Sequence, residues 1–358
     1  MSTLIIAEAG TAHGTSIKTA KELVDAAKRA KADCVKFQWV YADEILHPLT
    51  GNVQLPGGSI PLYERFKQLE VSVSFFEEIA HYTRSKEMLF ACSPFGKRSF
   101  FELCSIKPDI IKIASPELNH FELLQLASSE RFPVILSSGV SLLKDIEKAL
   151  SFFEHRKHSV TLLHCVTNYP APPEDYNLSV LKNLHSIFGV STGVSDHSKD
   201  PVLVPVLSVL QGGTVIEKHI TLNPEGDSLD DPVALTEKQF LQMSEAVRYA
   251  ENYPAEALKN LHDSYGADTV FKVIGNGIKT LAPSEKEHYK RTNRSIHYLS
   301  SFSKGHVLSS SDIASLRTEK ILTPGESPEL LNLFSGAVLQ CNVQSGEGAL
   351  LEHIVVKL

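Results

Sequence analysis

The sequence is poor in cysteine, and the few thiols it has are scattered. Five cysteines occur in 358 residues, their number is odd, and no two of them form a C-x-x-C pair. This pattern argues against a disulfide framework and against a structural zinc site. A reducing compartment, the cytoplasm, is therefore the expected location.

Long apolar runs and an excess of positive charge are also missing. No stretch approaches the roughly 18–20 apolar residues that a membrane-spanning helix needs. The opening residues MSTLIIAEAG lack a basic segment and are typical of a strand rather than of a signal peptide. The formal net charge of −7 argues against nucleic acid as the main partner. We therefore expect neither a membrane nor a nucleic acid as partner.

Short apolar runs alternate with helical patterns through the first two thirds of the chain. The runs are rich in Val, Ile, Leu and Phe, which is typical of strands buried on both faces. No G-x-G-x-x-G follows the first run, which argues against a doubly wound open sheet. Eight strand–helix repeats in about 250 residues predict a TIM (β/α)8 barrel. The predicted strands are residues 4–8, 34–38, 88–92, 109–113, 133–137, 160–165, 189–195 and 214–219.

The segments between these runs show helical spacing. Apolar residues recur at intervals of three and four within 20–27, as on the buried face of a helix. Two further helices are predicted to begin with capping boxes, formed by Ser74 with Glu77 and by Thr236 with Gln239.

The alternation of apolar runs and helical patterns ends at about residue 250, so the barrel is assigned to residues 1–250. Residues 251–290 are mixed and polar and predict a linker with partial helix. Residues 291–358 hold short runs punctuated by Gly and Ser, which predict a small β-rich domain. A domain of this size is near the lower limit for folding alone, so we expect it to be stabilised by packing against another part of the protein. Residues 47–66 form an insertion that a barrel places on its catalytic face, as a lid.

Polar side chains follow the predicted strands at their carboxyl ends, where barrel enzymes place their active sites. Two buried ammonium groups are costly unless anions meet them, so lysines among hydroxyl groups predict a site for a phosphate and a carboxylate. The candidate residues are Lys36, Gln38, Ser93, Lys112, Ser115, Glu117, Ser137, Tyr169, Ser195, His197 and His219.

Two histidines stand just past the ends of consecutive predicted strands, in GVSDHSKD and TVIEKHITL. His197 and His219 are predicted to hold one divalent metal, with the other coordination positions left to water and substrate. Two imidazole ligands are compatible with Mn, Mg, Zn or Fe and do not identify the metal. The alternative is that each histidine is a hydrogen-bonded core residue.

Together these stretches resemble the sialic acid synthase family. The resemblance rests on IIAEAG, FACSPF, IKIASPELNH, LLHCVTNYPAPPEDYNLSVL, GVSDHS and IEKHITL, in that order. KGHVLSSSDIASLRTEK resembles the antifreeze-like domain of that family, a small β-clip fold. The resemblance thus implies a TIM barrel followed by a β-clip domain.

The resemblance also implies an activity. Phosphoenolpyruvate would condense with an N-acetylated amino sugar, N-acetylmannosamine or a related diacetamido hexose, to give a nonulosonic acid and phosphate. The metal, Mn²⁺ or Mg²⁺, would lie on His197 and His219. The residues implied to hold phosphoenolpyruvate are Lys36, Ser93, Lys112, Ser115, Ser137 and Ser195. Those implied to face the sugar or its reacting carbon are Gln38, Glu117, Tyr169 and Asp230.

The same resemblance implies a partner subunit. Arg317 matches an arginine that similar enzymes send from the small domain of one subunit into the barrel of the other, which implies a domain-swapped homodimer. Glu117 is the candidate for stabilising the cation at the pyruvyl C2 atom or for moving a proton.

Two stretches depart from the family pattern. Ala12 and Gly14 replace polar groups near the sugar, and the loop 223–232 has an altered sequence. The acceptor sugar and the metal therefore stay open. The alternatives are a metal-dependent pyruvate aldolase, which would release no phosphate, an inactive relative, and a non-catalytic carbohydrate- or ice-binding protein.

Overall fold

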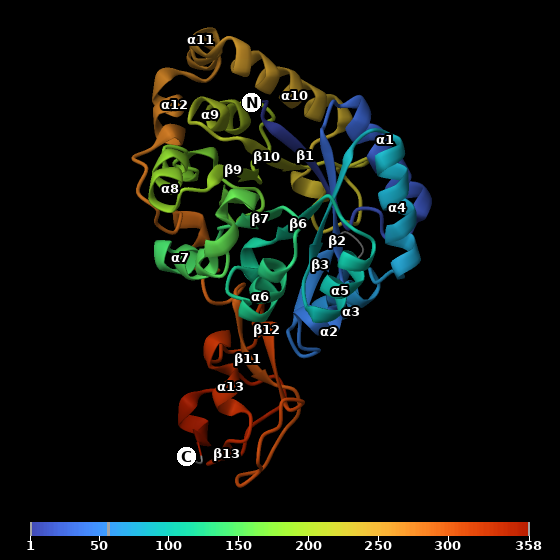
Figure 1. The fold of residues 1–358 in the computed structure, drawn as a ribbon, viewed down its shortest axis with the longest axis vertical. Helices are drawn as coiled ribbons and strands as arrows, with labels where there is room; N and C mark the ends of the chain where they lie inside the picture. Colours follow the sequence, from blue (N-terminus) through green and yellow to red (C-terminus); the bar gives the residue numbers. More distant parts are fainter. Residues whose placement is uncertain (1, 56–57, 357–358) are drawn as a thin grey trace.

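The computed structural model describes residues 2–55 and 58–356. A barrel domain carries a smaller domain at one end, drawn in red at the bottom of Figure 1. Eight parallel strands close the barrel in the order β1-β10-β9-β8-β7-β6-β5-β2, so the predicted TIM barrel is confirmed. Its strands are β1 (Leu4–Gly10), β2 (Cys34–Trp39), β5 (Leu89–Pro94), β6 (Ile110–Ile113), β7 (Val134–Ser137), β8 (Val160–Cys165), β9 (Ser191–Asp196) and β10 (Val215–His219).

Helices surround the barrel and bury their apolar faces against it (Figure 1). None of the helices within the described ranges is long and apolar enough to cross a membrane. They are α1 (Ile17–Arg29), α4 (Val73–Ser85), α5 (Lys97–Ser105), α6 (Phe121–Ser129), α7 (Leu143–Ser151), α8 (Val180–Phe188), α9 (Leu203–Leu210) and α10 (Glu237–Asn252). Short 3-10 turns are η1 (Ser115–Glu117), η2 (Glu154–Ser159), η3 (Pro173–Asp175), η4 (Asp231–Val233), η5 (Pro283–Glu285), η6 (Pro328–Leu330) and η7 (Leu351–His353).

The two predicted capping boxes had different outcomes. Thr236 caps α10 and exchanges hydrogen bonds with Gln239, as predicted. The box at Ser74 is wrong, because α4 begins at Val73 and its N-cap residue is Ser72. A serine two positions earlier therefore marks the start of this helix.

The segment predicted as a linker carries two further helices, α11 (Pro254–Tyr265) and α12 (Ala267–Ile274). Their apolar residues Leu261 and Val270 belong to the core of the barrel domain. The chain then runs without helix or strand, apart from η5, until the small domain begins. We call residues 275–293 the connecting segment.

The insertion after β2 contains α2 (Ala42–Ile45), the antiparallel strands β3 (Asn52–Leu55) and β4 (Gly58–Pro61), and α3 (Leu62–Lys67). Residues 56 and 57 of the predicted lid lie outside the described residues.

The small domain has a core of its own, formed around Ile296, Tyr298 and Phe334. Its strands β11 (Arg294–Tyr298) and β12 (Ile313–Arg317) form an antiparallel ribbon, and β13 (Val338–Leu339) pairs with β14 (Ile354–Val355). One short helix, α13 (Leu331–Phe334), completes it. The ribbon lies next to the barrel of the same chain, where the backbone of Arg317 pairs with that of Leu46 (Figure 1).

A fully buried ion pair lies between the barrel and its helices. The side chain of Lys218 on β10 and that of Asp196 on β9 point out of the barrel, toward the surrounding helices. Both side chains are fully buried there. The ammonium group of Lys218 also donates to the carbonyl oxygen of Ser198 over 2.6 Å. These two charged residues therefore stabilise the wall of the barrel and do not enter its mouth.

We predict that Lys218→Met lowers the free energy of unfolding by about 3–5 kcal/mol, because it leaves the carboxylate of Asp196 buried and unpaired. Urea unfolding followed by circular dichroism measures this loss. The double variant Lys218→Met/Asp196→Asn should recover part of it. Lys259→Met, which breaks an exposed pair with Asp263, serves as the matched control and should leave the midpoint unchanged. An equal midpoint for both single variants would contradict the prediction.

Candidate active site

Side chains at the carboxyl ends of the barrel strands converge on one cavity of about 70 Å³. Strand alternation decides which of them enter: Lys36 and Gln38 both do so from β2. Most of the predicted site residues take part. The lining consists of Glu8, Lys36, Gln38, Lys112, Ala114, Ser115, Pro116, Ser137, Cys165, Thr167, Tyr169, Ser195, His197, Glu217, His219 and Asp230.

Four buried charges form the floor of this cavity. The ammonium nitrogen of Lys36 lies 2.9 Å from Oε1 of Glu8 and 3.7 Å from Oε2 of Glu217. That of Lys112 lies 3.4 Å from Oε1 of Glu217. Burial alone would raise the pKa of Glu217, but the two lysines outweigh it and lower this pKa to about 2. The two carboxylates thus balance the two lysines. The anions that meet these lysines are thus carboxylates of the protein itself.

Two of the predicted serines are bound to this cluster. Ser195 Oγ donates to Oε1 of Glu217 over 3.0 Å. Ser93 is fully buried outside the lining, and its hydroxyl oxygen accepts from the ammonium group of Lys36 over 3.4 Å. Both hydroxyls therefore help to orient charged groups of the site.

Two other hydroxyl groups at the cavity have no hydrogen-bond partner. Ser137 Oγ and Thr167 Oγ1 are buried, and neither finds a donor or acceptor in the described parts of the chain. Buried polar groups are rarely left unpaired, so these two indicate a place for ligand oxygens. Ser115 also lines the cavity, and its hydroxyl oxygen accepts the backbone N–H of Gly139 over 3.0 Å.

The two histidines face the same cavity, with their ring centroids 5.6 Å apart. Nδ1 of His197 lies 2.9 Å from the carbonyl oxygen of Val166, so a proton on Nδ1 is donated there and Nε2 is free. Nδ1 of His219 lies 3.8 Å from Oδ2 of Asp230. The ring of Tyr169 stacks on that of His197 at 4.2 Å.

This arrangement fits a metal only with open coordination. Within the described ranges, no group of three or more His, Cys, Asp or Glu side chains is placed to hold an ion. A metal held by His197 and His219 would therefore take its other ligands from water and substrate. The free Nε2 of His197, with Nδ1 already bonded, is the state that metal-binding histidines adopt.

Another side of the cavity is formed by residues of β1 and β2 and by Asp230, in the loop after β10. Gln38 Nε2 donates to Oε1 of Glu8 over 2.8 Å. Gly10 has a φ of +54°, and a Cβ atom there would lie 3.4 Å from Oδ2 of Asp230 and 3.3 Å from Gln38. A side chain at this position would therefore narrow the space between Gln38 and Asp230. At Gly14, a Cβ atom would meet no other atom of residues 2–55 and 58–356 within 4 Å.

Glu117 is fully buried at the edge of the mouth, and two arginines of the small domain bind it. Arg317 donates to both carboxylate oxygens, over 3.0 and 2.8 Å, and Arg294 donates to Oε1 over 3.0 and 3.2 Å. All three residues belong to one chain. Within this chain the connecting segment brings the ribbon to its own barrel. The prediction that Arg317 enters the barrel of a second subunit stays a prediction.

Arg294 is a site residue that sequence reasoning missed. It stands directly opposite Arg317 in the β11–β12 ribbon, and its side chain also donates to the backbone oxygens of Phe95, Glu44 and Ser315. Its sequence surroundings are polar and irregular, so no periodicity marked it as buried.

A thiol also reaches the cavity, from Cys165 at the end of β8. The structure places its sulfur at the cavity, 3.7 Å from Nδ1 of His197.

Comparisons with known proteins agree with this geometry. The family model described as the NeuB family matches residues 23–259. The N,N'-diacetyllegionaminic acid synthase of Legionella pneumophila is 30% identical over 363 residues, which cover 99% of this chain and 95% of that protein. The structure of the spore coat polysaccharide biosynthesis protein SpsE from Bacillus subtilis matches with a TM-score of 0.82 at 28% identity, covering 100% of this chain and 96% of that one.

The structure of an N-acetylneuraminic acid synthetase from Leptospira borgpetersenii is also similar. It matches with a TM-score of 0.62 at 29% identity and covers 80% of this chain and 90% of that one. Because the family model spans more than half of the chain, and relatives align along nearly all of it, the resemblance to sialic acid synthases is confirmed and the chain belongs to the NeuB family.

Proposed function

We propose that this chain condenses phosphoenolpyruvate with the open-chain aldehyde of an N-acetylated amino sugar and releases phosphate with a nonulosonic acid. The acceptor would be N-acetylmannosamine or a related diacetamido hexose. One observation carries the proposal: a paired lysine cluster, two unpartnered hydroxyls and two imidazoles all face one cavity. The named relatives, synthases of legionaminic and N-acetylneuraminic acids, support it.

The phosphoenolpyruvate half of the site would be the lysine cluster with its hydroxyls. The phosphate oxygens would accept hydrogen bonds from Ser137 and Thr167, whose hydroxyls are otherwise unpaired. Lys112 and Lys36 would exchange one carboxylate contact each for the ligand, which keeps their charges compensated. The other residues of this half are Ser93, Ser115 and Ser195.

The acceptor half would lie between Gln38, Tyr169 and Asp230. The C3 atom of phosphoenolpyruvate would form a bond to the aldehyde carbon, whose oxygen takes up a proton and becomes a hydroxyl. Water would add at C2 and the C2–O bond to phosphate would break, leaving a ketone at C2. The two protons that the water loses would end on the new hydroxyl and on the departing phosphate. The water must lose a proton, and Glu8 suits this step because its Oε2 has no hydrogen-bond partner. Both oxygens of Glu117 are already bound by arginines, so its part is to hold Arg317 in the mouth.

His197 and His219 would hold the divalent metal, Mn²⁺ or Mg²⁺. Such an ion, when bound, polarises the carbonyl oxygen of the acceptor. Asp230, next to His219, would orient the acceptor's hydroxyl groups beside it.

A homodimer and a cytoplasmic location complete the proposal. The five cysteines are free thiols, which supports a reducing compartment. The dimer would exchange its small domains, so that the Arg317–Glu117 pair seen within this chain would form between two subunits.

The central prediction concerns phosphate release. With Mn²⁺ and phosphoenolpyruvate, the chain should release phosphate only when an acceptable amino sugar is present, whereas an aldolase using pyruvate would release none. A colorimetric phosphate assay over N-acetylmannosamine, its 6-phosphate and diacetamido hexoses measures this. Lys112→Met, which removes an ammonium group that would hold the ligand, is the matched negative control. Absence of release with every sugar would refute the proposed function.

A second prediction concerns the metal. His219→Ala should weaken Mn²⁺ binding at least tenfold and abolish turnover, because one imidazole alone cannot hold the ion in this open site. Isothermal titration with Mn²⁺ measures the affinity without substrates. His262→Ala, an exposed histidine on α11, should leave both quantities unchanged. Equal Mn²⁺ affinity in the two variants would remove the metal site from the proposal.

A further inference from the structure

The turn after β7 contains a strained residue next to the proposed phosphate site. We call residues 138–141 the β7 turn. Val140 has a φ of +43°, in the left-handed region that β-branched residues rarely adopt. Its side chain is completely buried. Such a conformation persists only where the surroundings enforce it, and it is commonest at functional sites.

The connecting segment supplies the groups that enforce this conformation. Glu285 accepts the backbone N–H of Val140 over 2.7 Å. Asn293 donates from Nδ2 to the carbonyl oxygen of Val140 over 3.2 Å. Lys279 donates to the carbonyl oxygen of Ser138 over 3.0 Å. Both polar groups of the strained residue are therefore held by one stretch of chain that belongs to neither the strands nor the helices of the barrel.

Glu285 also joins two loops of the active-site face. The same Oε1 atom that binds Val140 accepts the backbone N–H of Thr167, after β8, over 2.7 Å. The side chain of Glu285 is almost completely enclosed, and its Oε2 accepts the N–H of Ala282. Hydrogen bonds to a buried carboxylate are stronger than neutral ones, so this contact sets the spacing of the two loops.

The β7 turn is packed too tightly to shift without disturbing the site. A Cβ atom on Gly139 would lie 2.1 Å from Oγ1 of Thr167 and 2.9 Å from Oγ of Ser115. The turn also follows directly on Ser137, whose buried hydroxyl has no partner. A displacement of the turn would therefore change the positions of three hydroxyl groups that face the cavity.

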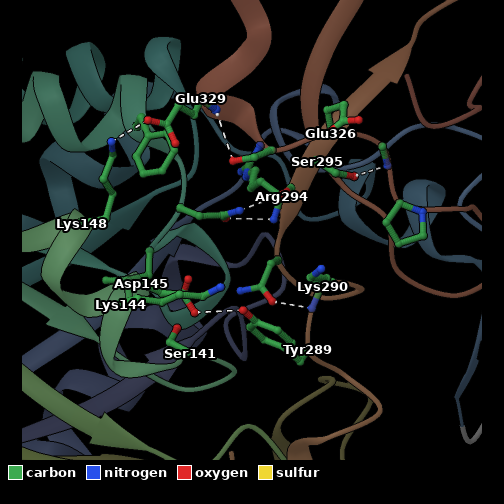
Figure 2. Close-up of a pocket in the computed structure, with 17 residues that line it drawn as sticks. Ser141, Lys144, Asp145, Lys148, Tyr289, Lys290, Arg294, Ser295, Glu326 and Glu329 are labelled. Atoms are coloured by element: carbon green, nitrogen blue, oxygen red, sulfur yellow. Dashed lines mark hydrogen bonds and ion pairs between the residues drawn. The ribbon is translucent and has the colours of Figure 1, made fainter. Parts of the chain in front are cut away.

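A cavity of about 470 Å³ lies beside the β7 turn and the connecting segment, between α7 and the small domain (Figure 2). There Tyr289 of the connecting segment donates to Asp145 of α7 over 3.2 Å, and the backbone N–H of Lys290 binds Asn293 over 2.8 Å. The side chain of Asn293 is thus oriented from both sides, and the connecting segment is attached to α7 as well as to the turn.

We propose that the connecting segment is part of the phosphate site, and that Glu285 and Asn293 are positioning residues that hold the β7 turn in its strained, ligand-binding shape. The inference rests on the proposed function, because it assigns the turn to the phosphate of phosphoenolpyruvate. It goes beyond that function because it assigns a role to residues 275–293: they would set the affinity for phosphoenolpyruvate and not that for the amino sugar.

The test uses Glu285→Ala and Asn293→Ala in the full chain, with Glu287→Ala, an exposed carboxylate of the same segment, as the control. Hydrogen exchange without substrates should become faster in peptides that cover residues 137–141 and 166–168. The KM for phosphoenolpyruvate should rise about tenfold, which corresponds to the loss of one hydrogen bond to a charged group, and the KM for the amino sugar should stay unchanged.

A rescue variant separates positioning from general stability. Val140→Gly in the Glu285→Ala background should recover part of the affinity for phosphoenolpyruvate, because glycine adopts a positive φ without strain. A merely structural role of Glu285 would lower the melting temperature and alter both KM values together, with no rescue.

An unchanged KM for phosphoenolpyruvate in both alanine variants, or an equal rise in both KM values, would overturn the inference. If the unaltered chain released no phosphate with any sugar, the proposed function would fail instead. The exchange rates, which need no substrate, would still decide whether Glu285 and Asn293 hold the turn.

Discussion

Balanced buried charge is the condition on which the mouth of this barrel depends. Lys36 and Lys112 are almost completely enclosed, yet every ammonium group lies within 3.7 Å of a carboxylate of Glu8 or Glu217. A single charge left unpaired at such a depth would cost several kcal/mol. Because the compensation is already present, an anionic ligand enters by exchange of partners. The groups that bind it are therefore ionised and oriented before it arrives, which is the arrangement that favours electrostatic catalysis.

The small domain adds two arginine side chains at the edge of the mouth. Arg294 and Arg317 face each other across the ribbon, where like charges are destabilising, and both turn to the single carboxylate of Glu117. A second carboxylate also meets Arg317: Oε1 of Glu319 lies 4.0 Å from its Nη1 atom. The same ion pairs thus attach the small domain to the barrel and set the charge at the edge of the site.

The barrel was predictable because its signal is repeated: eight apolar runs report the same architecture, so a weak run is supported by the others. Lys36 and Gln38 stand two apart on a strand and must share a face. The contacts of Glu217 with Lys36 and Lys112 were not predictable, because they depend on how three separate strands face one another inside the barrel. Arg294 and Glu285 lie in polar, irregular segments, and only the path of the chain in three dimensions brings them to the site. The start of α4 was misplaced because several serines compete there.

The cavity at the barrel mouth, about 70 Å³, is far below the roughly 300–1,000 Å³ of ordinary small-molecule sites. The mouth of the barrel is therefore narrow in this structure. The backbone of Leu46 is bridged to that of Arg317, and Thr50 accepts the N–H of Ile321. The insertion after β2 and the ribbon are therefore joined to each other by backbone contacts beside the mouth, so a change in either one bears directly on the other.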